Sequence, residues 1–222
     1  RLSLVGSEMC IRDSSQTVLD RWGIDWLHAL AAKGYIIVSA DGRGTGARGE
    51  EFRKMTYMQL GKYETMDQVE TAKYLKTLSF VDPDRIGIYG WSYGGFVSSL
   101  SMVKGEGNFK AGIAVAPVTD YRYYDNIYTE RYMRTPQENP DGYYENAPIN
   151  FADQLQGNFL IIHGMADDNV HLQNTTEFIE KLVQADKQFE MQLYTNRNHS
   201  IYGGNTRFHL FSRMMNFLQD KL

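Results

Sequence analysis

The sequence predicts an α/β fold in which a mostly parallel sheet is covered by helices on both faces. Short apolar runs alternate along the chain with segments whose apolar residues recur every three or four positions. The runs are almost continuously hydrophobic, as in strands that are buried on both faces. One run leads through a glycine-rich turn directly into a helical pattern. These three observations favour strand–helix alternation around one core.

Length and composition limit the class of protein. The chain has 222 residues, of which 42% are hydrophobic and 23% are charged, so one domain with a packed core is expected. No apolar run reaches the roughly 18 residues that a membrane span needs. The net charge is −4 without a basic stripe, which argues against a nucleic-acid partner. The single cysteine, Cys10, excludes an internal disulfide framework and a cysteine-based zinc site.

Residues 1–14 (RLSLVGSEMCIRDS) differ from the rest of the chain. They lack the cationic, apolar and small-residue order of a signal peptide, and they are similar to sequencing adaptor translated as coding sequence. We therefore interpret residues 1–14 as non-native and residues 15–222 as the folded domain, N-terminally truncated from a larger protein. The alternative is a native strand around residues 2–5.

The other elements are expected in the following order. Leu19, Trp22, Trp26 and Leu30 lie at helical spacing, and Gly34 ends that helix. A strand over residues 35–40 comes next. The remaining strands are expected over 85–90, 111–118, 159–162 and 189–195, and the remaining helices are marked by residues 69–78, 96–103, 176–185 and 208–218.

Two segments interrupt this alternation. Residues 44–49 fit G-x-G-x-x-G after a strand, but charged residues follow instead of an apolar helix. This segment therefore predicts a loop with positive φ angles and not a dinucleotide site. Residues 119–156 hold seven of the 15 tyrosines and follow the carboxyl end of a strand, where ligands bind in α/β sheets. We expect this insertion to form a pocket wall, with a self-packed surface elaboration as the alternative.

The strongest functional signal is the sequence GWSYG at residues 90–94, which matches G-x-S-x-G between a strand and a helix. This is the nucleophile turn of an α/β-hydrolase fold, in which the serine stands on a sharp bend that needs flanking glycines. The motif assigns Ser92 as the nucleophile. The backbone N–H of Tyr93 is then placed to donate to an oxyanion.

A serine nucleophile needs a base and a group that orients the base. In this fold the order along the chain is Ser, then Asp or Glu, then His. Asp167 or Asp168 follows the expected strand over 159–162, and His199 follows the last strand. The spacing leaves the choice between the two aspartates open.

The other four histidines have competing interpretations. His28 is expected to be a packed or surface residue of the first helix, His209 a structural residue of the last helix, and His163 a satisfied core histidine. A rival hypothesis takes His163, Asp167, Asp168 and His171 as zinc or iron ligands. It leaves the serine motif unexplained, so no metal and no cofactor are expected.

Five separated motifs resemble the catalytic domain of the dipeptidyl peptidase IV family, within the prolyl oligopeptidase group of serine peptidases. They are DGRG at 41–44, GWSYGG at 90–95, AVAPV at 114–118, YTERYM at 128–133 and HGMADDNVH at 163–171. The resemblance extends from about Ser15 to the C-terminus.

The resemblance implies a role for each matching residue. Ser92 is the nucleophile, Asp167 the orienting acid, His199 the general base and Tyr93 N–H an oxyanion donor. Asn169 matches a residue that binds the substrate backbone. The implied proline pocket consists of Tyr93, Val118, Tyr121, Tyr124, Tyr128 and Val170. The family usually has tryptophan at the position of Tyr121, and we expect tyrosine to keep the aromatic wall but to loosen it.

The resemblance also implies a substrate class, which is peptides with proline or alanine in the second position, released as N-terminal dipeptides. The family's propeller domain and a tyrosine that completes the oxyanion hole are missing from the matched part. Two alternatives therefore stand, which are a catalytically silent fragment and an esterase or aminopeptidase of the same fold. A homodimer is a further expectation from the family. The compartment stays open, with the periplasm or cell surface favoured for the parent.

Overall fold

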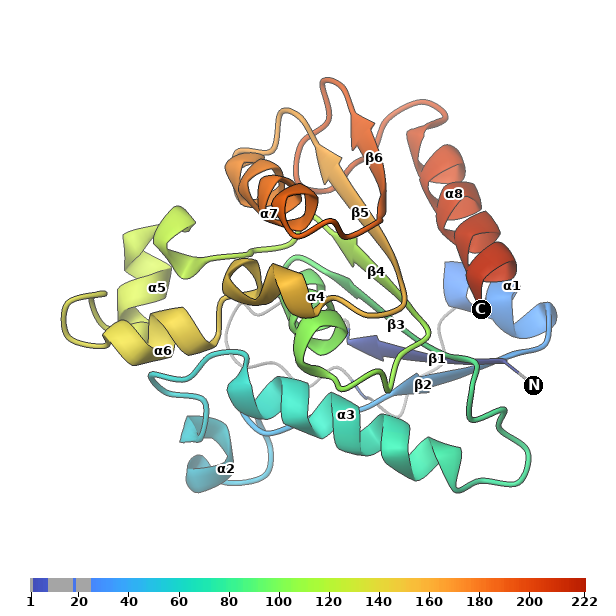
Figure 1. Ribbon diagram of the computed structural model, residues 1–222, viewed down its shortest axis with the longest axis horizontal. Helices are drawn as coiled ribbons and strands as arrows, with labels where there is room; N and C mark the ends of the chain where they lie inside the picture. The colour runs from blue at the N-terminus through green and yellow to red at the C-terminus, as the bar shows by residue number, and fades with distance from the viewer. Residues whose placement is uncertain (1, 8–17, 19–24) are drawn as a thin grey trace.

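A computed structural model describes residues 2–7, 18 and 25–222. Six parallel strands form one sheet in the order β2-β1-β3-β4-β5-β6. Their bounds are Leu2–Ser7 for β1, Tyr35–Ser39 for β2, Ile86–Trp91 for β3, Ala111–Val115 for β4, Asn158–Gly164 for β5 and Glu190–Tyr194 for β6. In Figure 1 the arrowhead of β1 points toward the side that carries α5 and α6, and the arrowheads of β5 and β6 point toward the top of the view.

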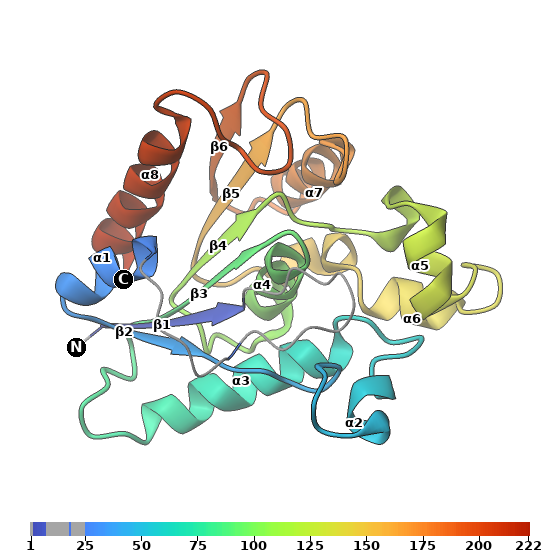
Figure 2. The same cartoon turned by 180° about the vertical axis from the view of Figure 1, so that it is seen from behind.

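Helices cover both faces of the sheet, as Figures 1 and 2 show from opposite sides. One face packs against α3 (Lys62–Lys76), α4 (Tyr93–Lys104) and α7 (Gln173–Gln184), and the other against α1 (Trp26–Ala32) and α8 (Thr206–Lys221). Alternate side chains of a strand point to opposite faces. Thus Ile161 of β5 packs in the first layer, while Leu160 and Ile162 pack in the second.

Most predicted elements are present with shifted ends. The helix marked by residues 69–78 extends over 62–76, and the strand expected over 111–118 ends at Val115. The chain leaves the sheet there, and Ala116 has a φ of 45°. The predicted helix stop at Gly34 is confirmed, with a φ of 95°. Leu19 and Trp22 lie outside the described residues.

The first strand agrees with the alternative interpretation of the N-terminus. Residues 2–7 form β1, which pairs with both β2 and β3. The segment is therefore an inner strand of the sheet. The non-native origin of residues 1–14, and with it the domain division at residue 15, stays a prediction.

The two segments that interrupt the strand–helix alternation, residues 44–49 and 119–156, form a loop and a set of short helices. Residues 44–49 form the expected loop, with positive φ at Gly44, Ala47 and Gly49, and the short helix α2 (Glu50–Lys54) follows. Residues 119–156 fold into two 3-10 turns, η1 (Tyr121–Tyr123) and η2 (Pro148–Gln154), and two helices, α5 (Asn126–Met133) and α6 (Pro140–Glu145). The helices α5 and α6 project beside the carboxyl ends of the strands (Figure 1).

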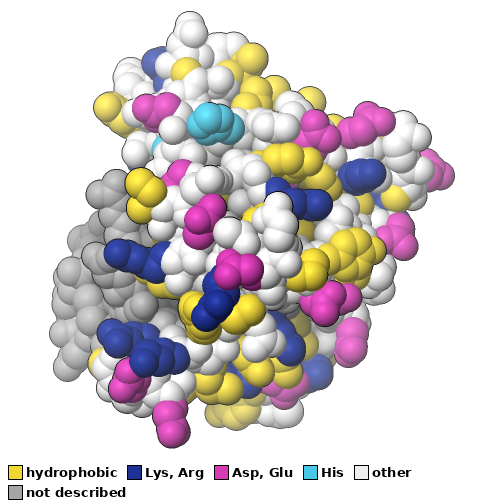
Figure 3. Space-filling view, turned by 90° about the vertical axis from the view of Figure 1, so that its left-hand side faces the viewer, with side chains coloured by type: hydrophobic (Ala, Val, Ile, Leu, Met, Phe, Trp, Pro, Cys, Tyr) yellow, Lys and Arg dark blue, Asp and Glu magenta, His cyan; other side chains and the backbone are white. Residues whose placement is uncertain are grey.

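Basic and acidic side chains are interspersed on the side of the molecule that carries α5 and α6 (Figure 3). None of the described helices is long and apolar enough to cross a lipid bilayer.

Candidate active site

Ser92 stands on a sharp turn between β3 and α4. Its φ and ψ angles are 57° and −117°, in a region that residues with a Cβ atom rarely adopt. A Cβ atom at Gly90 would lie 2.1 Å from the Gly94 carbonyl oxygen, and one at Gly95 would lie 2.8 Å from the Val115 carbonyl oxygen. Glycine at these positions therefore makes the turn possible, as the motif predicts.

The structure holds the strained turn in place by backbone hydrogen bonds. The Ser92 N–H donates to the Val115 carbonyl oxygen at 2.8 Å, and the Phe96 N–H donates to the Ser92 carbonyl oxygen at 2.9 Å. The second bond begins α4, so Ser92 lies at the amino end of this helix, where the helix dipole favours negative charge.

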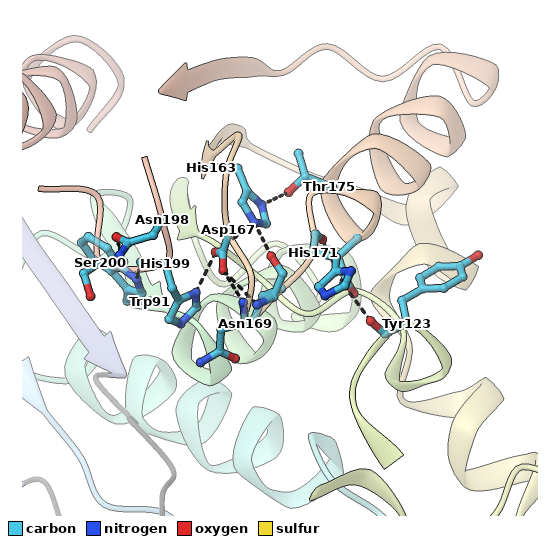
Figure 4. Close-up of polar contacts among 12 residues, drawn as sticks. Trp91, Tyr123, His163, Asp167, Asn169, His171, Thr175, Asn198, His199 and Ser200 are labelled. Atoms are coloured by element: carbon cyan, nitrogen blue, oxygen red, sulfur yellow. Dashed lines mark hydrogen bonds and ion pairs between the residues drawn. The ribbon is translucent and has the colours of Figure 1, made fainter. Parts of the chain in front are cut away.

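Asp167 and His199 come together from the loops that follow β5 and β6 (Figure 4). His199 Nδ1 lies 2.7 Å from Asp167 Oδ2. A carboxylate only accepts hydrogen bonds, so Nδ1 carries the proton and Nε2 of the neutral ring keeps its lone pair. The Trp91 Nε1–H donates to the His199 carbonyl oxygen at 3.0 Å and fixes the backbone of this residue. The imidazole is thus prepared to act as a base at Nε2.

Asp167 stays charged although its side chain is buried. Burial raises the pKa of the Asp167 carboxyl, but hydrogen bonds from His163 and His199 outweigh it and hold the pKa well below the usual range. The backbone N–H groups of Asn169 and Val170 also donate to Oδ1, each at 3.0 Å. The carboxylate is therefore available to stabilise an imidazolium at His199.

Asp168 has a different position from Asp167. It lines a cavity of about 1030 Å³, which Ser92 and His199 also line. The aspartate that contacts His199 is Asp167, so the geometry separates two residues that the spacing left open. The cavity also brings together four residues of the predicted site or its surroundings, which are Tyr124, Tyr128, Asn169 and His171.

A second, narrower cavity of about 30 Å³ opens beside the serine. Its lining consists of Ser92, Tyr93, Val118, Tyr121, Tyr124 and Tyr128. Val170 is fully buried in the same apolar cluster. The six residues of the expected proline pocket are thus together in the structure, five of them lining the cavity directly.

The tyrosines of the narrow cavity pack against one another. The Tyr121 ring stacks on that of Tyr128 with centroids 6.3 Å apart, and Tyr124 meets Tyr128 edge-on at 5.3 Å. The Tyr124 hydroxyl donates to Asn169 Oδ1 at 2.7 Å, which joins the tyrosine cluster to the loop of the acid. The insertion therefore forms a pocket wall, as one of the two interpretations expects.

The geometry does not support the rival metal site. His163 Nε2 donates to the Val170 carbonyl oxygen at 2.8 Å, and its Nδ1 contacts the Thr175 hydroxyl at 2.7 Å. Both ring nitrogens are occupied, so neither has a lone pair open to a metal. Within residues 2–7, 18 and 25–222, no group of three His, Cys, Asp or Glu side chains is arranged to hold a metal ion. His163 is a satisfied core histidine, as expected.

His28 and His209 both make contacts within or beside their helices. His28 belongs to the amino-terminal cap of α1, where its Nδ1 accepts from the Asp25 N–H at 3.1 Å. His209 Nδ1 lies 2.8 Å from the Tyr194 hydroxyl. Both expectations for these residues are met.

Glu64 of α3 is a residue near the site that the sequence patterns did not single out. Its carboxyl group is buried and accepts a short hydrogen bond from the Tyr93 hydroxyl. The sequence does contain a pattern that points to Glu64. Glu64, Gln68 and Ala72 follow one another at intervals of four residues and share the buried face of the helix. A glutamate on the apolar face of a helix indicates a buried polar contact.

Comparison with known sequences shows what the chain is similar to. Residues 21–222 match the Prolyl oligopeptidase family. A probable dipeptidyl-aminopeptidase B of Paracoccidioides brasiliensis is 47% identical over 209 residues, which cover 92% of this chain and 23% of that protein. The prolyl endopeptidase FAP of Mus musculus is 41% identical over 210 residues, which cover 93% of this chain and 28% of that protein.

Solved structures give the same result. The crystal structure of Porphyromonas gingivalis dipeptidyl peptidase 4 has a TM-score of 0.96 and 56% identity, and the match covers 100% of this chain and 31% of that one. A putative dipeptidyl aminopeptidase IV from Bacteroides ovatus has a TM-score of 0.93 and 36% identity with the same coverage. The chain therefore spans less than a third of each of these relatives.

Proposed function

Because the chain belongs to the prolyl oligopeptidase family, we propose that it forms the hydrolase part of a serine peptidase that releases N-terminal dipeptides ending in proline or alanine. The observation that carries this proposal is the Asp167–His199 hydrogen bond of 2.7 Å beside the same cavity as the strained Ser92. The names of the relatives, which include dipeptidyl peptidases and a prolyl endopeptidase, support the peptide substrate.

In the proposed first step, the Ser92 hydroxyl oxygen attacks the carbonyl carbon of the substrate's second residue. His199 Nε2 takes the hydroxyl proton and then gives it to the leaving amine as the C–N bond breaks. Asp167 keeps the imidazole in the required tautomer and stabilises its positive charge. The Tyr93 N–H donates to the oxygen that becomes negative. One such donor is typically worth about 10²–10³ in rate.

In the second step, water hydrolyses the acyl-enzyme. His199 removes a proton from the water, the hydroxide attacks the ester carbon, and the bond to Ser92 Oγ breaks as the proton returns to that oxygen. The dipeptide leaves with a free carboxylate, and the enzyme is restored.

The narrow cavity supports the preference for proline. Its walls are aromatic, and a proline ring that enters it exchanges water for tyrosine faces. Alanine is small enough for the same space but buries less apolar surface, so a weaker preference is expected.

The proposal is tested by a substrate panel on the full-length protein that carries this chain. Gly-Pro and Gly-Ala nitroanilides are compared with a free-amino-acid nitroanilide and a short acyl ester, each with Ser92→Ala as the control. Turnover of the Gly-Pro substrate that Ser92→Ala abolishes is the expected result. Preferential turnover of the ester or the single amino acid would instead assign an esterase or aminopeptidase, and no Ser92-dependent turnover would contradict a serine peptidase.

The same panel on the 222-residue chain tests the silent-fragment alternative. We expect weak or no turnover from this chain by itself, because the family's amine-binding propeller residues lie outside the matched part. Efficient Gly-Pro turnover by the chain would contradict that expectation.

A further inference from the structure

Glu64 is a buried carboxylic acid that the proposed mechanism does not use. It is 4% exposed and lies in the first turn of α3, which packs against α4. The approach of the two helices depends on Gly61, whose φ is 92°. A Cβ atom there would lie 2.4 Å from the ring of Phe96. The packing thus brings the amino end of α3 against the helix that begins after Ser92.

Both oxygens of this carboxyl group have partners. The Tyr93 hydroxyl donates to Oε1 in a short hydrogen bond, and the Gly61 N–H donates to Oε2 at 3.0 Å. Tyr93 is the residue after Ser92, and its ring meets Phe96 edge-on at 5.3 Å. The Glu64 carboxyl group therefore ties α3 to a wall of the narrow cavity beside the serine.

The surroundings leave the charge of Glu64 adjustable. Burial raises the pKa of the Glu64 carboxyl to about 7, although the hydrogen bonds from Tyr93 and Gly61 oppose the shift. The charged and titratable groups that act on it are Tyr93 of α4, Tyr121 of η1, Tyr128 of α5, Asp67 of α3 and Arg43 of the loop after β2. Arg43, the cation among them, is bound by Asp67 through bonds of 2.6 and 2.9 Å.

We propose that Glu64 is a positioning residue that holds the Tyr93 side chain, and with it the pocket wall and the N–H next to Ser92, more firmly as a carboxylate than as an acid. A hydrogen bond to an ionised acceptor is stronger than one to a neutral acceptor. Tyr93 remains the donor throughout the neutral range, because burial raises the pKa of its hydroxyl well above the usual value. This inference rests on the proposed role of Ser92.

The test is a double-mutant cycle of Glu64→Gln and Tyr93→Phe in the full-length protein. Activity toward Gly-Pro and Gly-Ala nitroanilides is measured as a function of pH, with kcat and KM separated. Glu70→Gln is the matched control, because Glu70 lies on the same helix and its side chain is 68% exposed. We expect Glu64→Gln to lower kcat/KM for Gly-Pro about tenfold above pH 7 and less below it, within the range of coupling between contacting residues.

Three further results are expected. The preference for proline over alanine falls in Glu64→Gln, because the wall that contacts the larger ring is no longer held. The double variant is no worse than the worse single variant, because both changes remove the same bond. Glu70→Gln leaves the pH profile and the proline preference unchanged.

Several results would overturn the inference. Glu64→Gln with the wild-type pH profile and proline preference would do so, as would an equal loss for both substrates at every pH, which indicates a structural role only. Inactivity of the wild-type protein toward both substrates would overturn the proposed function together with this inference, so the two failures are distinguishable.

If Glu64→Gln does not fold, infrared difference spectra of the wild-type protein test the inference instead. A carboxylic-acid band that titrates near neutral pH and shifts in Tyr93→Phe supports the inference, and its absence contradicts it.

Discussion

Two buried carboxyl groups act on the neighbours of Ser92, and their pKa values are shifted in opposite directions. Asp167, on the loop after β5, is 7% exposed, and Glu64, in α3, is 4% exposed. Asp167 accepts from two backbone N–H groups and an imidazole, with a second imidazole nitrogen at 3.3 Å. Glu64 accepts from one N–H and one phenol. The pKa falls for the first group and rises to about 7 for the second. Burial raises the pKa of both carboxyl groups, and it is outweighed only at Asp167, where two imidazoles and two backbone N–H groups surround the carboxylate.

The largest expected effect comes from removing the charge of Asp167. Asp167→Asn keeps the shape but lets the amide donate to His199, which favours the wrong tautomer. We expect kcat to fall by about 10⁴, the loss seen when the triad acid of a serine protease is changed in this way. Steady-state kinetics with the Gly-Pro substrate measures it. Asp168→Asn is the control, and an equal loss there would contradict the assignment of Asp167.

The two carboxyl groups should also shift stability with pH in opposite directions. The pKa of Glu64 is raised in the folded protein. The contribution of this residue to the free energy of unfolding is therefore fully present below the ordinary pKa of 4.5 and is lost as pH rises through about 7. The full difference is about 3 kcal/mol for the pKa change. The pKa of Asp167 is lowered in the folded protein. The contribution of this residue to the free energy of unfolding is therefore present above the ordinary pKa of 3.8 and is lost as pH falls below that value.

Urea unfolding as a function of pH separates the two groups. In Glu64→Gln, the decline of the free energy of unfolding between pH 4.5 and 7 should flatten. In Asp167→Asn, the loss at acid pH should flatten instead. A Glu64→Gln curve parallel to that of the wild type would show that Glu64 is charged throughout, like Asp167.

A smaller effect is expected when the imidazole of His163, the second one near Asp167, loses its contact with Thr175. Thr175→Val removes the hydroxyl that contacts His163 Nδ1 at 2.7 Å and leaves a buried nitrogen unsatisfied. We expect a loss of about 1–3 kcal/mol in the free energy of unfolding and a modest fall in kcat. Thr176→Val, at the next position of α7, serves as the control. No change in stability would indicate that His163 does not depend on this contact.

The smallest effect is expected from Tyr124→Phe, which removes the hydrogen bond from the Tyr124 hydroxyl to Asn169 at 2.7 Å. The bond is exposed, so we expect a rise in KM of a few-fold, in line with about 1 kcal/mol for an ordinary hydrogen bond. The measurement is KM for Gly-Pro nitroanilide. A large fall in kcat would instead place Tyr124 closer to the chemistry than its contacts indicate.

The family and the fold could be predicted from sequence, and both are confirmed. Inner parallel strands such as β5 are nearly uniform apolar runs, so their pattern is hard to mistake. The turn at Ser92 was also predictable, because only glycine fits at positions 90 and 95. These features depend on residues close together in the chain, so the sequence alone predicts them.

The remaining features depend on contacts between distant segments. The bond from Tyr93 to Glu64 joins residues 29 positions apart, and no local pattern pairs them. The helices of the insertion, α5 and α6, have mixed polarity around polar caps, so their periodicity is weak. Strand β1 lies within residues 1–14, whose similarity to translated adaptor sequence predicts a non-native origin, although the apolar residues of this segment fit a strand.

The account depends most on Ser92 being an activated nucleophile. The most direct measurement is the reaction of the full-length protein with a fluorophosphonate probe, followed by mass spectrometry of the labelled peptide. We predict labelling at Ser92 that is lost in Ser92→Ala and strongly slowed in His199→Ala and Asp167→Asn. Labelling at another residue, or equal labelling of the wild-type protein and His199→Ala, would contradict the account.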